Sequence, residues 1–197
     1  MMPFSIADIQ INSVGEQRKN VLQPIIDYIQ SKKNEDSEIN LNFICTHNSR
    51  RSQFAQVWAT VAASIYNIDA NCFSGGVEIT ACNERTIASL KRFGFDNTLI
   101  DNQNPHYTLS SDFILKPIVL FSKLVDDELN PTTNFAAIMT CSHADENCPF
   151  IAGADERIPI LYNDPKKFDN TNKEKQKYDE RSMQMAAEMF YVFSKIK

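Results

Sequence analysis

Three stretches of the chain repeat apolar residues with the period of a helix that buries one face. Their apolar positions are Leu22, Ile25, Ile26 and Ile29; Phe54, Val57, Trp58, Val61 and Ile65; and Ala186, Met189, Phe190 and Phe193. The pattern predicts one helix near the start, one over about 51–66 and one at the end. Pro24 is tolerable in this helix if it lies in the first turn, where a missing N–H is no loss. A fourth helix is predicted over 83–93, because Asn83 suits an N-cap and Gly94 a C-terminal stop.

Between the helical stretches lie short apolar runs that end in polar residues or glycines. They predict strands over 41–45, 71–74, 135–140 and 158–161, with Gly75 and Gly76 ending the second. The runs at 106–109 and 118–121 either form a hairpin or extend the sheet. Their place in the fold stays open at this point.

Strands that alternate with helices indicate a parallel sheet with right-handed crossovers. We therefore predict an α/β fold, a three-layer sandwich with a central, mainly parallel four-stranded sheet. Residues 1–39 form an N-terminal helical extension that ends in a polar linker at 31–37, and 40–197 form the main domain. Ligands bind at the carboxyl ends of such strands. Cys45, Cys141 and Asp164 all follow predicted strands, which places them at one edge of the sheet.

Composition narrows the class of protein. The chain has 197 residues and a net charge of −5, which disfavours a nucleic-acid partner. No apolar run approaches the ~20 residues of a membrane span. The first eight residues lack the features of a secretory signal, so a cytoplasmic protein is expected. Five cysteines, an odd number, argue against a disulfide scaffold.

The most informative segment is Cys45-Thr46-His47-Asn48-Ser49-Arg50-Arg51-Ser52, between a strand and a helix. The helix N-terminus and Arg51 favour the Cys45 thiolate, and Ser52 can donate its hydroxyl to the sulfur. The loop amides and Arg51 can also hold a tetrahedral oxyanion. Two arginines oppose the dipole at a helix start, so a purely structural helix would not favour them. A buried cysteine followed by a basic helix start is the alternative that remains.

Cys141 and Cys148 form a second cysteine pair, with six residues between them. This spacing is not that of a short zinc motif, and no second pair exists, so we predict no metal site. The pair can close into a disulfide if its loop rearranges. Two unrelated, partly buried thiols fit the residues equally well.

Asp164 precedes Pro165 in a turn. A partly desolvated aspartic acid can protonate the leaving oxygen of an oxyanion transfer. An ordinary Asx turn before a proline explains the same residues.

In this order, the three pieces resemble the low molecular weight protein tyrosine phosphatase superfamily. The Cys45–Ser52 loop is similar to its phosphate-binding loop, with Cys, five residues, Arg and Ser. Cys141 and Cys148 resemble the redox cysteines of the thioredoxin-coupled arsenate reductase branch, and Asp164-Pro165 resembles the general-acid position. The resemblance covers roughly residues 40–197.

The resemblance implies a cysteine relay. Cys45 attacks the oxyanion held by Arg51 and the amides of Thr46, His47, Asn48, Ser49 and Arg50, and Asp164 protonates the leaving oxygen. Cys141 then attacks Cys45 and releases arsenite, Cys148 attacks Cys141, and thioredoxin reduces the final disulfide. No cofactor is implied. Cys72 and Cys82 match no position in the relay, and we interpret them as structural.

The chain departs from the family pattern at several positions. His47 stands where glycine is usual, which suggests a different loop shape, and Arg50 adds a second positive charge near the site. Gln56 replaces the acidic residue that holds a potassium ion in some relatives, so no ion is expected. Lys166 follows Asp164-Pro165 where phosphatases usually carry tyrosine.

Three functions remain at this point. The first is a thioredoxin-dependent arsenate reductase. The second is a low molecular weight phosphatase that hydrolyses phosphate monoesters through a phosphocysteine at Cys45. The third is a module that binds an oxyanion without turnover. Arsenate and phosphate share shape and charge, so the loop alone does not choose between them.

Overall fold

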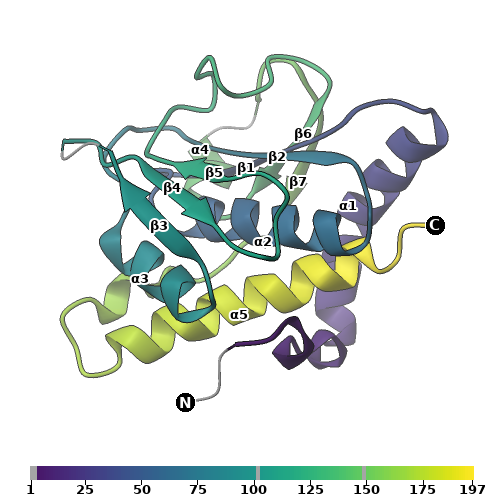
Figure 1. The fold of residues 1–197 in the computed structure, drawn as a ribbon. Helices are drawn as coiled ribbons and strands as arrows, with labels where there is room; N and C mark the ends of the chain where they lie inside the picture. Colours follow the sequence, from purple (N-terminus) through teal and green to yellow (C-terminus); the bar gives the residue numbers. More distant parts are fainter. Residues whose placement is uncertain (1–3, 101–102, 148–149) are drawn as a thin grey trace.

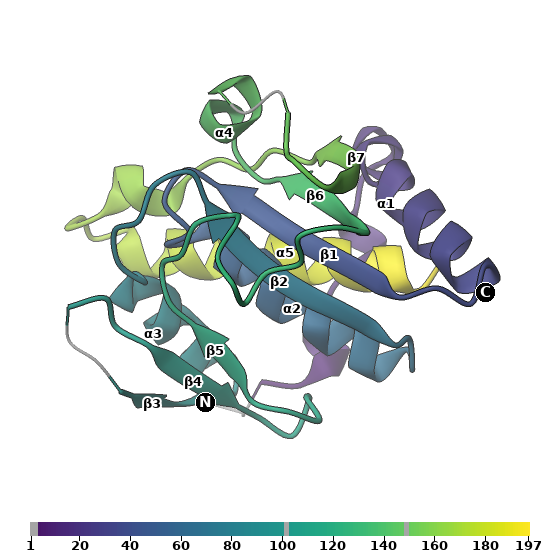
Figure 2. The same cartoon turned by 90° about the horizontal axis from the view of Figure 1, so that it is seen from above.

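The centre of the protein is a sheet of four parallel strands. The computed structural model describes residues 4–100, 103–147 and 150–197, and its central sheet has the order β2-β1-β6-β7 (Figure 2). The strands are β1 (Ile39–Cys45), β2 (Ala70–Gly76), β6 (Phe135–Met139) and β7 (Ala154–Pro159). Strands β1 and β6 are buried at every position, as expected for the middle of a sheet covered on both faces. The predicted α/β fold is confirmed.

Helices α1 (Glu16–Asn34), α2 (Arg51–Ile65) and α5 (Glu174–Phe193) share one core with one face of this sheet. Figure 1 shows α2 and α5 side by side along that face. The other face is covered by the short helix α4 (Ser142–Asn147) and irregular segments, where Ile44, Phe135 and Met139 form a smaller cluster. The sheet thus lies between two layers, and the carboxyl ends of β1 and β6 meet at one edge.

The N-terminal extension packs into the main core. Two short 3-10 turns, η1 (Ile6–Asp8) and η2 (Ile11–Ser13), precede α1, whose residues Leu22, Ile25 and Ile29 are fully buried. Pro24 lies inside α1 and not in its first turn, because the helix begins at Glu16. Burial of this apolar face offsets the hydrogen bond that the proline removes. The boundary predicted after residue 39 falls inside β1, which begins at Ile39, and α1 shares its core with the main domain.

A second, antiparallel sheet lies beside the first (Figure 2). It contains β3 (Asp96–Leu99), β4 (Tyr107–Ser110) and β5 (Ile118–Leu120), and β4 pairs with β5. Of the two possible arrangements, the hairpin is the one found. Strand β3 was not predicted because its residues are mostly polar. Helix α3 (Glu84–Arg92) precedes it, with the Asn83 side chain as N-cap and Gly94 in the left-handed region, as predicted.

Two elements differ from the sequence prediction. Strand β7 begins four residues before the predicted 158–161 and overlaps it only at residues 158 and 159, because its first half carries charged residues that hide the strand pattern. Helix α4 was not predicted between the second pair of cysteines.

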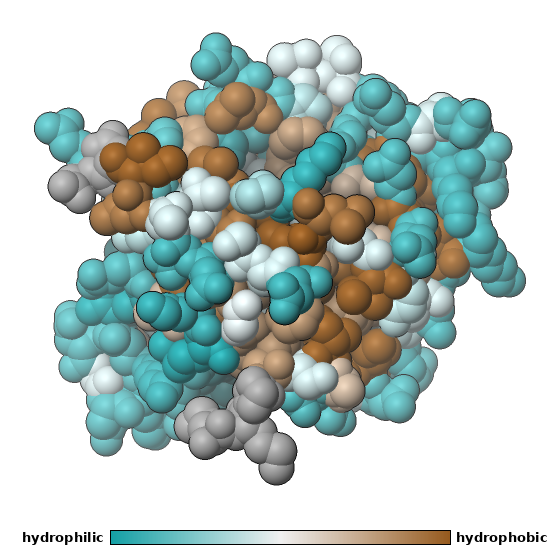
Figure 3. Space-filling view, viewed as in Figure 1, coloured by the Kyte–Doolittle hydropathy of each residue, from teal (hydrophilic) through white to brown (hydrophobic). Residues whose placement is uncertain are grey.

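The face drawn in Figure 3 mixes polar and apolar side chains, with apolar residues gathered near its middle. Within the described ranges, no helix has the length and apolarity to cross a membrane.

Candidate functional site

The Cys45 loop connects β1 to α2 at the carboxyl edge of the sheet. Cys45 is the last residue of β1, and α2 begins at Arg51. Loop residues 46–50 therefore lie directly before a helix N-terminus, where backbone N–H groups have no partner within the helix. The arrangement predicted from the spacing of Cys45 and Arg51 is present.

Cys45 is buried and lies at one end of a chain of hydrogen bonds. Its Sγ is 3.1 Å from Oγ of Ser52, which also accepts a hydrogen bond from Nδ2 of Asn48 at 2.8 Å. The Asn48 amide is oriented by the N–H of Lys123, which donates to its Oδ1 at 3.2 Å. Because the Ser52 oxygen accepts a hydrogen bond from Asn48, the Ser52 hydroxyl hydrogen is free to point at the sulfur. A donor aimed at Cys45 stabilises the thiolate.

The loop is held from below by neighbouring backbone. Thr46 O accepts hydrogen bonds from the N–H groups of Val77 and Glu78 at 2.8 and 2.9 Å. Gly76 lies so close that a Cβ there would stand 2.8 Å from the N of Asn48. A side chain at Gly76 would displace the loop, which explains why glycine occupies this position.

His47 does not need the backbone freedom of glycine. Among the loop residues 46–50, Asn48 has the positive φ, at 44°. The His47 side chain turns outward, and its Nε2 lies 3.1 Å from Oε2 of Glu78. The departure at His47 thus alters the rim of the loop, while Asn48 takes the left-handed conformation, which asparagine tolerates.

Arg50 points away from the loop. Its Nε donates to the hydroxyl of Tyr178 at 2.7 Å, and Nη2 lies 3.2 Å from Oδ2 of Asp169. Burial and the hydrogen bond to Asp169 raise the pKa of Tyr178 above its ordinary value. The expected second positive charge at the site is therefore paired with a carboxylate, because α5 and the segment before it supply acidic and phenolic partners.

Arg51 and Asp164 lie together, although they are far apart in the sequence. Nη2 of Arg51 is 2.8 Å from Oδ2 of Asp164, and Nη1 donates to the Tyr162 carbonyl at 3.3 Å. Asp164 caps the 3-10 turn η3 (Pro165–Phe168) by accepting from the N–H of Lys166 at 2.9 Å. The predicted proton donor therefore stands at the predicted oxyanion ligand.

Cys141 lies beside the loop, just after β6. Its Sγ is 3.4 Å from Oγ1 of Thr46, and Cys45 belongs to the same small buried cluster. The Thr46 hydroxyl is also 3.3 Å from Nδ1 of His143. Cys141 is fully buried. Cys148, the other predicted redox cysteine, lies outside the described residues.

The remaining two cysteines differ from Cys45 in their surroundings. Burial raises the pKa of Cys72 and of Cys82 to about 12. The Cys82 thiol donates to Oε1 of Gln53 at 2.9 Å, and Nε2 of Gln53 donates to the Asn48 carbonyl at 2.6 Å. Sequence patterns did not indicate that these side chains support the loop. Within the described part of the chain, no three His, Cys, Asp or Glu side chains group closely enough to hold a metal ion.

Curated relatives share this chain's sequence over most of their length. The arsenate reductase of Staphylococcus aureus (strain Newman) is 36% identical over 123 residues, which cover 62% of this chain and 76% of the relative. Arsenate reductase 2 of Staphylococcus saprophyticus is 35% identical over the same shares. A scan against protein-family models gives no match.

Solved structures share the fold at low sequence identity. A low molecular weight phosphotyrosine phosphatase from Vibrio cholerae O395 superposes with a TM-score of 0.56, at 10% identity over 79% of this chain and 95% of that one. A YwlE mutant from Bacillus subtilis gives 0.52, at 11% identity over 80% and 97%.

The central sheet, with the loop from Cys45 to Ser52 at its edge, has the same fold as these low molecular weight phosphatase-like structures. By its sequence, the chain belongs to the arsenate reductase family. It is an enzyme of that family, as predicted from the resemblance.

Proposed function

We propose that this protein reduces arsenate through a relay of Cys45, Cys141 and Cys148, and that thioredoxin restores it. The observation that carries the proposal is the position of Cys141. Its sulfur lies against Thr46, the residue that follows the nucleophile, so a second thiol stands next to the loop. A phosphatase has no use for a thiol in that place.

Binding is the first step. An oxyanion in the loop accepts hydrogen bonds from the N–H groups of residues 46–51 and from the guanidinium of Arg51. In the structure, this guanidinium is paired with Asp164. Arg51 then releases the Asp164 carboxylate and binds the substrate oxyanion in its place. The negative charge of the bound oxyanion favours a proton on the released Asp164 carboxyl, which prepares it to act as a general acid.

Reduction follows in balanced steps. The Cys45 thiolate bonds to arsenic, and Asp164 protonates the oxygen that leaves as water. The Cys141 thiolate then attacks the Cys45 sulfur, and the electron pair of the S–As bond stays on arsenic. Arsenic(V) becomes arsenic(III) and leaves as arsenite, while two thiols become one Cys45–Cys141 disulfide.

Formation of the second disulfide, Cys141–Cys148, requires a change in α4. A six-residue helix is about 9 Å long, and the Cα atoms of a disulfide lie within about 7 Å. Helix α4 comprises the six residues between the two cysteines in the sequence, so we propose that it unfolds when Cys148 attacks Cys141 and frees the Cys45 thiolate. Helix α4 is suited to this, because it is short and mostly polar. Thioredoxin then reduces the Cys141–Cys148 disulfide.

Arsenate turnover with thioredoxin, thioredoxin reductase and NADPH tests the relay. The Cys148→Ser variant is expected to release about one equivalent of arsenite and stop, because its Cys45–Cys141 disulfide is not resolved. Cys72→Ser is the matched control and should turn over normally. Sustained turnover by Cys148→Ser would contradict the relay.

The alternative is a phosphatase that forms a phosphocysteine on Cys45. The Arg51–Asp164 pair is compatible with it, because the same cation and acid serve hydrolysis equally well. Steady hydrolysis of an aryl phosphate that Cys141→Ser leaves unchanged, together with no arsenate reduction, would establish it. Lys166 and Lys167 after Asp164-Pro165 speak against a tyrosine-lined substrate mouth.

A further inference from the structure

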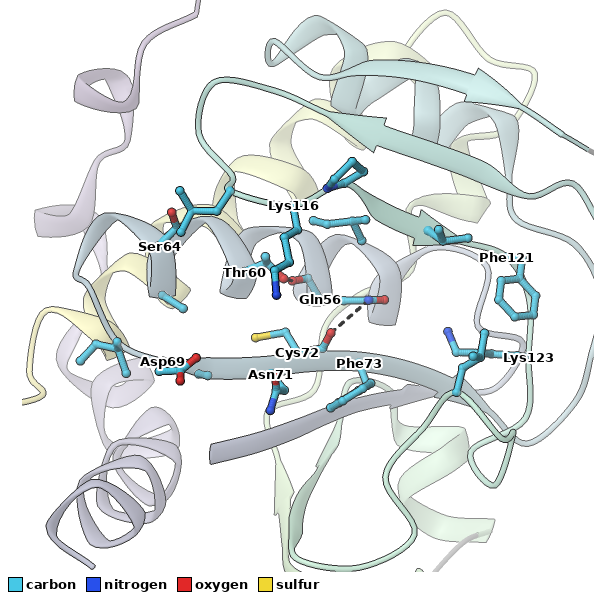
Figure 4. A pocket seen from close by; sticks show the side chains of 18 residues that line it. Gln56, Thr60, Ser64, Asp69, Asn71, Cys72, Phe73, Lys116, Phe121 and Lys123 are labelled. Carbon is cyan, nitrogen blue, oxygen red and sulfur yellow. Dashed lines mark hydrogen bonds between the residues drawn. The ribbon is translucent and has the colours of Figure 1, made fainter. Parts of the chain in front are cut away.

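A cavity of about 490 Å³ lies apart from the mouth of the Cys45 loop. It is bounded by α2, by the outer edge of β2 and by the segment from Leu115 to Lys123 (Figure 4). Volumes of this order are typical of sites for small organic ligands. None of the steps proposed for arsenate uses it.

Lys123 is buried with its charge aimed into this cavity. The residue is only 4% exposed, and Figure 4 shows its ammonium pointing toward the space beside Gln56. Within residues 4–100, 103–147 and 150–197, Nζ makes no ion pair and no hydrogen bond, and it contacts the Phe121 ring at 4.9 Å. A buried ammonium without a counter-charge is costly.

The surroundings of Nζ leave this cost uncompensated. Burial lowers the pKa of Lys123 to about 8, and Asp127 and Cys82 oppose that change only in part. The amide of Gln56 is engaged at both ends, because its Oε1 accepts from Ser74 and its Nε2 donates to the Cys72 carbonyl. The cavity therefore presents a positive charge that no carboxylate of the described residues bonds directly and that Asp127 offsets only in part.

The rest of the wall combines apolar side chains with the polar residues Thr60, Ser64 and Asn71. Phe73, Ile118, Val119 and Leu129 line the cavity, and Val119 and Leu129 are 42% and 57% exposed. The other charged lining residues, Asp69 and Lys116, are exposed. A ligand that fits has one anionic end for Lys123 and an apolar body for these side chains.

We propose that this cavity binds a small monocarboxylate with an apolar chain. The carboxylate pairs with the ammonium of Lys123, and the chain lies along Phe73, Ile118 and Val119. One buried ammonium matches a single negative charge, whereas a phosphate dianion needs more donors. The site is independent of the arsenate reductase proposal.

Calorimetric titration of the full chain with octanoate at pH 7 tests this site. Octanoate is expected to bind with one-to-one stoichiometry, and Lys123→Met should weaken it at least about tenfold, the loss of one buried charge pair. Lys116→Met, which removes an exposed charge from the same cavity, should change little. Octanol, with the same chain and no charge, should bind weakly and equally to wild type and Lys123→Met.

Three results would overturn the proposal: equal octanoate affinity in Lys123→Met, octanol binding as tight as octanoate, or competition by saturating phosphate. Competition would place octanoate in the Cys45 loop. Phosphate binding by Lys123→Met checks that the loop is intact, since the Lys123 N–H supports Asn48. If that variant does not fold, Val119→Asp decides, because a carboxylate in the wall repels the ligand and occupies Lys123.

Discussion

Nη2 of Arg51 lies 2.8 Å from Oδ2 of Asp164, so the cation at the oxyanion loop is paired with a carboxylate from a distant turn. Their side chains are 13% and 31% exposed, which places the pair at the border of the solvent. An arriving oxyanion must compete for the guanidinium. The pair therefore links substrate binding to the state of the proposed acid.

Replacement of Arg51 by lysine tests whether oxyanion binding needs the two coplanar donors of the guanidinium. Lysine keeps the charge but cannot bind two oxygens in one plane. We expect phosphate affinity in Arg51→Lys to fall at least about tenfold by calorimetry. Arg50→Lys is the matched control, because Arg50 bonds to Tyr178 and Asp169. A loss of affinity in Arg50→Lys as large as in Arg51→Lys would contradict this assignment.

The Asn48–Ser52–Cys45 chain of hydrogen bonds predicts coupled effects. In Asn48→Asp, the Nδ2 donor to Ser52 is replaced by an oxygen, so the Ser52 proton is drawn away from Cys45. The rate of Cys45 alkylation, followed by mass spectrometry across pH, should fall about tenfold or more, the worth of a hydrogen bond to a charged group. Ser52→Ala should have a similar effect, and the double variant should add little. Additive effects would mean that the residues act separately.

Helix α1 supports the segment that carries Asp164. Nη2 of Arg18 bonds to the Ile160 carbonyl at 2.6 Å and to Glu188 at 2.8 Å, and Tyr162 donates to Glu188 at 2.7 Å. Burial and Glu188 raise the pKa of Tyr162 well above its ordinary value. Arg18→Ala leaves Glu188 buried without its cation, which should lower the free energy of unfolding by about 3 kcal/mol in urea titrations. Lys19→Ala, which removes a half-buried lysine whose carboxylate partner Glu16 is exposed, is the control and should have little effect.

Lys123 predicts an unusual dependence of stability on pH. Its pKa is about 8 in the folded protein against an ordinary 10.5, so the buried charge destabilises the fold below pH 8. Between pH 8 and 10.5 the unfolded chain binds more protons, and this penalty is relieved. Lys123→Met should thus be more stable than wild type by up to roughly 3 kcal/mol at pH 7.

Urea titrations at pH 7, 9 and 10.5 measure this difference. The advantage of Lys123→Met should shrink as the pH rises through that range and vanish near its upper end. Lys116→Met provides the baseline, because Lys116 is exposed. A constant difference at all three pH values would indicate a packing effect instead of a charge effect.

Local patterns were sufficient for the elements with strong periodicity. The stripe from Phe54 to Ile65 identified α2 to within one residue, and the apolar run before Cys141 identified β6. Strand β3 and helix α4 escaped because their residues are mostly polar. Pro24 lies inside α1 because burial of the helix compensates for the proline. The extent of that burial depends on distant elements of the chain.

By itself, the sequence determined the parallel α/β sheet and the placement of Cys45, Cys141 and Asp164 at one edge, because strand ends in such a sheet converge. It also determined the loop from Cys45 to Ser52, whose function depends on adjacent residues. Only the tertiary structure decided which charges act there. Arg50 is paired with Asp169 and Arg51 with Asp164, and Lys123 is buried with no carboxylate bonded to its ammonium among the described residues. Such outcomes depend on side chains far apart in the chain, whose distances and burial no local pattern records.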